Sequence, residues 1–205
     1  MIGAGGPQFL PGLRVGLLGG SFNPAHEGHL AISLAALELL KLDRVVWLVS
    51  PHNPLKARAD LADYSERLNY ARKIAAHPKI SISDFEAREG LTYTIDTIAR
   101  LKRRYRQTKF VLLIGADNLA QLDRWKDWTK LFDAVPIAVL ARPGYDRSAL
   151  AAKAAHRYAK ARLPTRAAGL LAGHATPAWT FISTTNRDES ASAIRARGEW
   201  PANRR

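Results

Sequence analysis

Cysteine is absent from this chain of 205 residues. Its absence excludes disulfide frameworks, thiolate zinc sites, iron–sulfur clusters and cysteine nucleophiles, and an intracellular setting fits it best. The chain also lacks any run of eighteen apolar residues, and residues 1–12 contain neither a basic segment nor a long apolar one. We therefore expect a cytoplasmic protein that carries no membrane span and no targeting signal.

Acidic residues are scarce relative to basic ones. Lys and Arg total 31 against 18 for Asp and Glu, which gives a formal net charge of +13. Such an excess indicates anionic partners: nucleic acid, a membrane surface or small phosphorylated substrates. Much of it lies in two basic runs, residues 102–106 and 157–166, and such runs usually cover a solvated helix face. Charge alone does not choose among these partners.

Short apolar runs alternate with amphipathic segments along the whole chain. The pattern predicts strands at 13–18, 45–49, 80–83, 110–114, 136–140 and 180–182, and helices at 28–41, 63–77, 94–105, 149–162 and 190–197. Because the strands are apolar at nearly every position, we expect an α/β fold with a Rossmann-like, doubly wound parallel sheet in three α/β/α layers. The length fits a single domain over residues 1–205, with 1–12 as a flexible N-terminal extension.

A glycine turn follows the first predicted strand. Gly19-Gly20-Ser21-Phe22 would let backbone N–H groups approach phosphate oxygens without a Cβ in the way. The segment fits neither the P-loop pattern nor the spacing of the dinucleotide-binding glycines. It therefore predicts a phosphate site of another kind, at the carboxyl end of a strand where α/β proteins bind ligands.

Two histidines stand at the start of the next helix. His26 and His29 are three residues apart, so they face the same way at a helix end that itself attracts anions. A pair of capping or core histidines is the alternative interpretation, and it suits a lone histidine better than this pair. A phosphate monoester nucleophile is already an anion near neutral pH, so the histidines need only stabilise charge and no covalent intermediate is expected.

The segment from Gly19 to His29 reads G-G-S-F-N-P-A-H-E-G-H. It resembles the opening motif G-G-[ST]-F-[DN]-P-x-H-x-G-H of the bacterial nicotinate-nucleotide adenylyltransferases, within the nucleotidyltransferase superfamily with the H-x-G-H signature. Every fixed position is present. Pantetheine-phosphate adenylyltransferases and cytidylyltransferases share the two-histidine loop, so this motif implies the reaction class and leaves the acceptor open.

A late segment is similar to the family's I-S-x-[ST]-x-I-R motif, which clasps the ATP phosphates at a helix start. Hydroxyls, N–H groups and a forked cation suit phosphate oxygens, although a plain serine cap with a solvated arginine would look alike. Lys56, in the loop 50–61, is placed to reach ATP or the incoming phosphate. The residues that the late motif assigns to ATP are Ser190, Ser192, Ile194 and Arg195.

Three middle segments resemble those of the nicotinate enzymes: [ST]-Y-T, I-G-x-D-x-[LF] with a downstream tryptophan, and an R-P-G turn. In the family the aspartate contacts nucleotide or ribose groups, and the tryptophan stacks on the pyridine ring. From the residues alone, Trp128 competes with Trp125 for that role. The residues that the resemblance assigns to the mononucleotide are Thr92, Tyr93, Thr94, Asp117, Trp125 and Arg142.

The resemblance implies an enzyme that transfers AMP from ATP to nicotinate mononucleotide, with Mg²⁺ carried by the ATP phosphates and no metal ligands from the protein. Nicotinamide mononucleotide and phosphopantetheine remain open as acceptors. A basic nucleic-acid-binding module is the alternative of a different class, disfavoured because the two basic runs contain only Tyr105 and Tyr158 for stacking on bases. We expect neither a membrane nor a nucleic acid as partner, and the sequence leaves a homo-oligomer open.

Overall fold

The fold is that of a computed structural model, which describes residues 9–52, 61–141, 146–183, 191–198 and 200. The strands are β1 Arg14–Gly20, β2 Arg44–Val49, β3 Ile80–Ser83, β4 Lys109–Gly115, β5 Ile137–Ala141, β6 Arg162–Leu163 and β7 Trp179–Ser183. The α-helices are α1 Glu27–Leu39, α2 Tyr64–Ile74, α3 Phe85–Arg88, α4 Thr94–Arg104, α5 Ala116–Ala120, α6 Trp128–Ala134, α7 Asp146–Leu150, α8 Lys153–Arg157 and α9 Ala191–Ala196. Three 3₁₀ segments are η2 Leu122–Arg124, η3 Ala159–Ala161 and η4 Thr165–Gly173.

The described strands form one parallel sheet in the order β3-β2-β1-β4-β5-β7-β6. The chain winds outward from β1 to β3, then returns to place β4 beside β1 and winds outward the other way. The strand order therefore reverses between β1 and β4, and ligands bind in the crevice at such a point, beyond the carboxyl ends of the strands. The predicted doubly wound sheet is confirmed.

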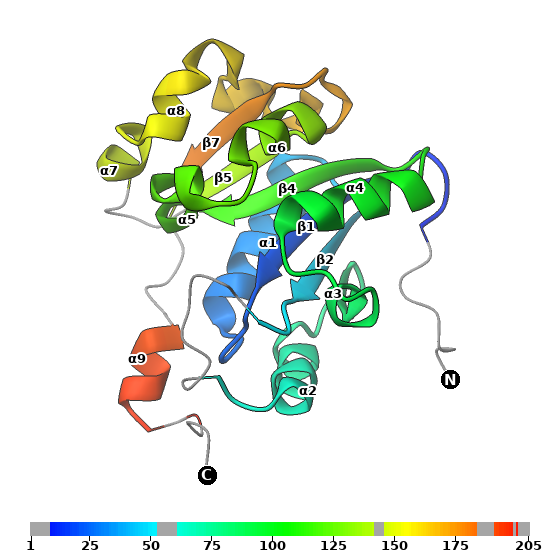
Figure 1. The fold of residues 1–205 in the computed structure, drawn as a ribbon, viewed down its shortest axis with the longest axis vertical. Coiled ribbons are helices and arrows are strands. Elements are labelled where there is room, and N and C mark those ends of the chain that lie inside the picture. The colour runs from blue at the N-terminus through cyan, green and yellow to red at the C-terminus, as the bar shows by residue number, and fades with distance from the viewer. Residues whose placement is uncertain (1–8, 53–60, 142–145, 184–190, 199, 201–205) are drawn as a thin grey trace.

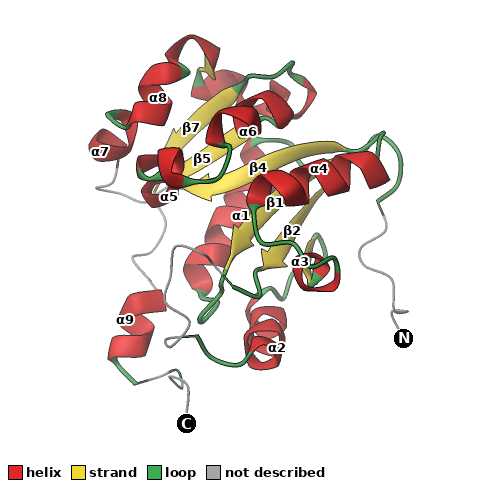
Figure 2. Cartoon of the chain, in the orientation of Figure 1, coloured by secondary structure: helices red, strands yellow, loops and turns green. Residues whose placement is uncertain are grey.

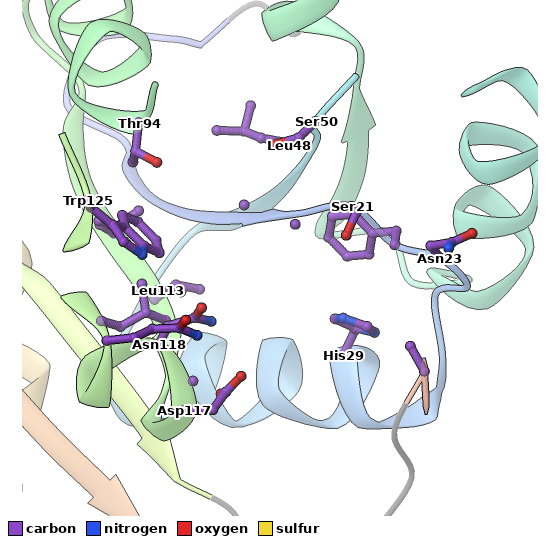
Figure 3. Close-up of a pocket in the computed structure, with 18 of the residues that line it drawn as sticks. Ser21, Asn23, His29, Leu48, Ser50, Thr94, Leu113, Asp117, Asn118 and Trp125 are labelled. Carbon is purple, nitrogen blue, oxygen red and sulfur yellow. The ribbon is translucent and has the colours of Figure 1, made fainter. Parts of the chain in front are cut away.

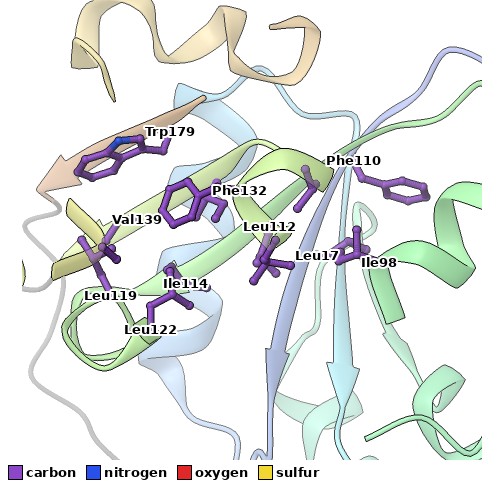
Figure 4. Packing of buried hydrophobic residues seen from close by; sticks show 14 of the residues in the cluster. Leu17, Ile98, Phe110, Leu112, Ile114, Leu119, Leu122, Phe132, Val139 and Trp179 are labelled. Atoms are coloured by element: carbon purple, nitrogen blue, oxygen red, sulfur yellow. The ribbon is translucent and has the colours of Figure 1, made fainter. Parts of the chain in front are cut away.

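Helices cover both faces of this sheet (Figures 1 and 2). Side chains of consecutive strand residues point to opposite faces, so Leu112 packs under α4 and α6 while Leu113 packs toward α1. Figure 4 shows the side chains between the sheet and helices α4 and α6, with Leu112 and Phe132 close to Leu17 and Ile98. Burial on both faces explains why β1, β2, β4 and β5 are apolar almost throughout.

The prediction of a single helix at 149–162 is wrong. The chain there forms α7, α8 and η3, with Ala152 extended between the first two. Tertiary contacts set these breaks: the Tyr158 carbonyl accepts a hydrogen bond from Trp179 Nε1 at 2.8 Å, and the Tyr158 ring stacks on Phe132 with centroids 3.9 Å apart. A strand that the sequence did not predict, β6, then pairs with β7.

Other predicted elements lie within a few residues of the observed ones, and the short helices α3, α5 and α6 were not predicted. Residues 9–12 of the predicted N-terminal extension are described, and Phe9 packs edge-on against Tyr105 and Phe110 at 5.0 and 5.8 Å. Among the described helices, none combines the length and the apolar character needed to cross a bilayer.

Candidate active site

A cavity of about 1010 Å³ opens at the carboxyl ends of β1, β2 and β4. Figure 3 shows Ser21 and His29 on one side of it, with Trp125 and Asn118 on the other. The sheet topology thus brings segments that are a hundred residues apart in the sequence to one site. The predicted site residues that line the cavity are Gly19, Gly20, Ser21, Phe22, His26, His29, Thr92, Tyr93, Thr94, Asp117, Trp125, Ser192 and Arg195.

One described residue of the predicted set lies outside the lining of the cavity. Ile194 is buried in a small cluster with Ala62 and Trp200, and it does not line the cavity. Its side chain packs α9 against Ala62 and Trp200, and its contact with ATP stays a prediction. Lys56, Arg142 and Ser190 lie outside the described residues.

The loop after β1 adopts an unusual backbone conformation. Phe22 has φ +46°, in the left-handed region that bulky residues rarely occupy, at a cost on the order of 1–3 kcal/mol. Its ring stacks on Trp47 with centroids 5.0 Å apart and an interplanar angle of 10°. Trp47 is itself fully buried, and its Nε1 donates to Ser33 Oγ at 2.8 Å. Packing against this tryptophan holds the loop in its strained form.

The two histidines lie against each other, as their spacing predicts. The ring centroids of His26 and His29 are 3.9 Å apart. The backbone N–H of His26 donates to Nδ1 of His29 at 3.2 Å, and the carbonyl of His29 accepts from Ser33 Oγ at 2.8 Å. This geometry assigns Nδ1 as an acceptor, so neutral His29 carries its proton on Nε2.

Asn23 connects the loop after β1 to the C-terminal segment. Its carbonyl accepts a short hydrogen bond from Nη1 of Arg195, and its Oδ1 accepts from the Ala62 N–H at 3.1 Å and from Trp200 Nε1 at 2.9 Å. Arg195 therefore touches the loop after β1 while it lines the cavity. The sequence motif pointed to Arg195 but gave no sign of the role of Asn23 or Trp200.

Asp117 stands just past β4, as predicted. Its carboxylate folds back over Gly115, where an added Cβ would meet Asp117 Oδ1. The two candidate tryptophans also separate. Trp125 lines the cavity, whereas Trp128 packs edge-on against Phe132 and Tyr158, with centroids 6.4 and 6.1 Å away.

Two cations beside Trp125 were not found by sequence reasoning. Arg124 and Lys126 both line the cavity. Lys126 Nζ lies 4.4 Å from the centre of the Tyr93 ring and 3.3 Å from Asp96 Oδ2. Their position next to the tryptophan in the sequence is the signal that would have pointed to them.

Glu86 is a buried carboxyl in the cavity wall that the sequence analysis also missed. It is 5% exposed and accepts hydrogen bonds from Ser50 Oγ at 2.7 Å and from Thr97 Oγ1 at 3.0 Å. Burial raises the pKa of this carboxyl, and the two hydrogen bonds counteract part of that rise. Glu86 joins the end of β2 to α4, which begins in the predicted Thr92–Thr94 segment.

Comparison with known proteins shows the family of the chain. A family model described as cytidylyltransferase-like matches residues 17–197. A probable nicotinate-nucleotide adenylyltransferase of Parvibaculum lavamentivorans is 50% identical over 190 residues, covering 93% of this chain and 94% of that protein. Another from Ruegeria pomeroyi is 47% identical over 198 residues, covering 97% and 92%.

A solved structure shares the fold. Nicotinic acid mononucleotide adenylyltransferase of Plasmodium falciparum, in complex with NaAD, aligns with a TM-score of 0.68 at 18% identity, over 90% of this chain and 83% of that chain. The solved structure shows only a shared fold. The two bacterial relatives match this chain over nearly their whole length, and their sequence identity shows the family. The chain belongs to the nicotinate-nucleotide adenylyltransferases, nucleotidyltransferases of the cytidylyltransferase-like family.

Proposed function

We propose that this protein transfers AMP from ATP to nicotinate mononucleotide, giving the deamido dinucleotide and pyrophosphate in NAD biosynthesis. One observation carries the proposal: a single cavity joins the glycine loop, the histidine pair and Arg195 to Asp117 and Trp125. Its volume of about 1010 Å³ is at the upper end of the usual range for ligand pockets, so it can hold two nucleotides side by side.

The reaction is a direct in-line displacement. A 5′-phosphate oxygen of the mononucleotide forms a bond to the α-phosphorus of ATP, while the bond from that phosphorus to the bridging oxygen breaks and pyrophosphate leaves with the oxygen. The attacking oxygen is already anionic, so no side chain needs to remove a proton. Nε2–H of His29 and the guanidinium of Arg195 suit the charge that develops on the phosphate oxygens.

Mg²⁺ belongs to the substrate in this proposal. ATP enters as its Mg²⁺ complex, in which phosphate and water oxygens supply the octahedral ligand set that this ion prefers. The metal offsets phosphate charge, and the protein contributes hydrogen-bond donors around it. Lys56 and Ser190 stay predicted phosphate ligands.

The acid form of the mononucleotide fits the cations near Trp125. A pyridine ring stacked on that indole would have Arg124 and Lys126 nearby, and a carboxylate gains more from them than a neutral amide does. Asp96 pairs with Lys126 and weakens this contribution without cancelling that of Arg124. The same cations give phosphopantetheine, which has no ring carboxylate, no comparable advantage.

A pyrophosphate-release assay tests the assignment. Values of kcat/KM are measured with ATP and each of nicotinate mononucleotide, nicotinamide mononucleotide and phosphopantetheine. We expect kcat/KM for nicotinate mononucleotide to exceed that for either other acceptor by at least about tenfold, which corresponds to roughly 1.4 kcal/mol of discrimination. A preference for the amide or for phosphopantetheine would contradict the proposed acceptor, while adenylyl transfer itself would stand.

A further inference from the structure

A buried arginine lies behind the loop after β1, the predicted phosphate loop. Arg67, in the second turn of α2, is 1% exposed and does not line the cavity. It lies on the helix face that also buries Leu68 and Ala71, where an apolar side chain would be expected. A guanidinium at such a position needs an explanation, because burying a charge is costly.

The guanidinium binds the main chain of two loops. Its Nη1 donates to the carbonyl of Ser21 at 2.5 Å and to that of Ser50 at 2.8 Å, and Nη2 donates to the carbonyl of Pro51 at 3.1 Å. Nε donates to the carbonyl of Ala62 at 3.1 Å. Among the described residues, every hydrogen-bond acceptor of Arg67 is a backbone carbonyl. One side chain thus ties the loop after β1 to the loop after β2.

The contact with Ser21 fixes the direction of a peptide group. The C=O and N–H of a trans peptide point in opposite directions. Since Arg67 lies behind the loop and holds the Ser21 carbonyl, the N–H of Phe22 is turned to the other side, where both loop residues line the cavity. An N–H with this orientation is a donor for phosphate oxygen.

The contact with Ser50 extends to the opposite half of the site. Ser50 Oγ donates to Glu86, Thr97 Oγ1 donates to the same carboxyl, and Thr97 Oγ1 lies 3.3 Å from the carbonyl of Tyr93. Arg67 therefore connects the phosphate loop, through Ser50 and Glu86, to the predicted mononucleotide segment.

We propose that Arg67 is a positioning residue for ATP: its fork of N–H groups holds the Ser21 carbonyl so that the loop presents its N–H donors to the phosphates. This inference rests on the proposed function only in taking ATP as the nucleotide. Lysine cannot replace it, because a single ammonium on a flexible stem does not match four carbonyls in fixed directions. The buried positive charge adds to the attraction for the polyphosphate.

The test compares Arg67→Lys and Arg67→Met with Arg72→Met, which changes an exposed arginine on the same helix whose Nη1 donates to Asn69 Oδ1. Calorimetry with a non-hydrolysable ATP analogue and Mg²⁺, without any mononucleotide, measures nucleotide affinity. We expect Arg67→Lys and Arg67→Met to weaken it by about tenfold or more, and Arg72→Met to leave it unchanged. Because no acceptor is present, the result does not depend on which mononucleotide the enzyme uses.

Steady-state kinetics and thermal unfolding complete the test. In the folded variants the KM for ATP should rise far more than the KM for the mononucleotide. Arg67→Lys should stay folded, since it keeps the charge and most of the volume of the side chain. Unchanged analogue affinity, an equal rise in both KM values, or a failure of both variants to fold would each show that Arg67 is only a structural link, and would overturn the proposal.

Discussion

The backbone N–H of His26 donates to Nδ1 of His29 across 3.2 Å, so the main chain of one histidine sets the tautomer of the other. Since Nδ1 accepts this bond, the proton of the neutral imidazole lies on Nε2. The H-x-G-H spacing therefore does more than bring two rings together. It places an Nε2–H donor at the N-terminus of α1, beside the loop that is predicted to bind phosphate.

Substitutions at His29 should show which of its two ring nitrogens acts as the donor. His29→Ala should lower kcat by about 10² or more with little change in thermal stability, as expected for the loss of a transition-state donor. His29→Gln can place an amide N–H near the position of Nε2, so it should retain more activity than His29→Asn, whose amide reaches only the Nδ1 position. Steady-state kinetics would measure all three.

The exposed His156 in α8 supplies the control, because His156→Ala removes an imidazole far from the cavity. Near-normal turnover of His29→Ala would show that His29 does not act in catalysis. Higher activity of His29→Asn than of His29→Gln would show that the donor is not Nε2.

Trp125 and Trp128 should have different phenotypes. Trp125→Ala should raise the KM for the mononucleotide by about tenfold and leave the KM for ATP nearly unchanged, because the stacking surface in the cavity is lost. Trp128→Ala should instead lower the melting temperature, because it removes ring contacts with Phe132 and Tyr158. An equal rise of both KM values in Trp125→Ala would mark that tryptophan as structural too.

Local patterns predicted the residues whose role follows from a strand end or a helix start. His26 and His29 stand at the start of α1, and Asp117 stands just past the end of β4, and the apolar patterns reveal both elements. Trp125 and Trp128 could not be told apart from spacing, because both follow α5 and both pack against the core. Tertiary packing brings only Trp125 to the cavity, while Trp128 meets Phe132.

Long-range contacts account for what the sequence did not reveal. Arg67 finds its acceptors 46 and 17 residues earlier in the chain, and Glu86 binds Ser50 across 36 residues. No helical or strand period encodes such partners. The end of α8 within the helix predicted at 149–162 has the same origin, because Trp179 Nε1 in β7 donates to the Tyr158 carbonyl.

Removal of divalent metal should abolish turnover without affecting the fold. If Mg²⁺ enters only with ATP, excess EDTA should stop pyrophosphate release, and added Mg²⁺ should restore it in proportion to the MgATP formed. The melting temperature of the protein without nucleotide should be the same with and without EDTA. A clear fall in that temperature would reveal a metal bound by the protein itself.

Glu86 should make stability depend on pH in a defined direction. Burial raises its pKa above the ordinary value of 4.5, so between that value and the raised one the folded protein keeps a proton that the unfolded chain has released. The contribution of this group to the free energy of unfolding is therefore complete below pH 4.5 and is lost as pH rises through the folded pKa, by at most about 1.4 kcal/mol per pH unit.

Glu86→Gln removes the titration and keeps the size of the side chain. Urea unfolding of both proteins over a pH series gives the difference in unfolding free energy, in which all other titrating groups cancel. The wild type should lose stability relative to Glu86→Gln as pH rises from 4.5, then run parallel to it once the carboxyl is ionised in the folded protein. Parallel curves over the whole series would show that Glu86 titrates alike in both states, so that Ser50 and Thr97 stabilise its carboxylate as fully as water does.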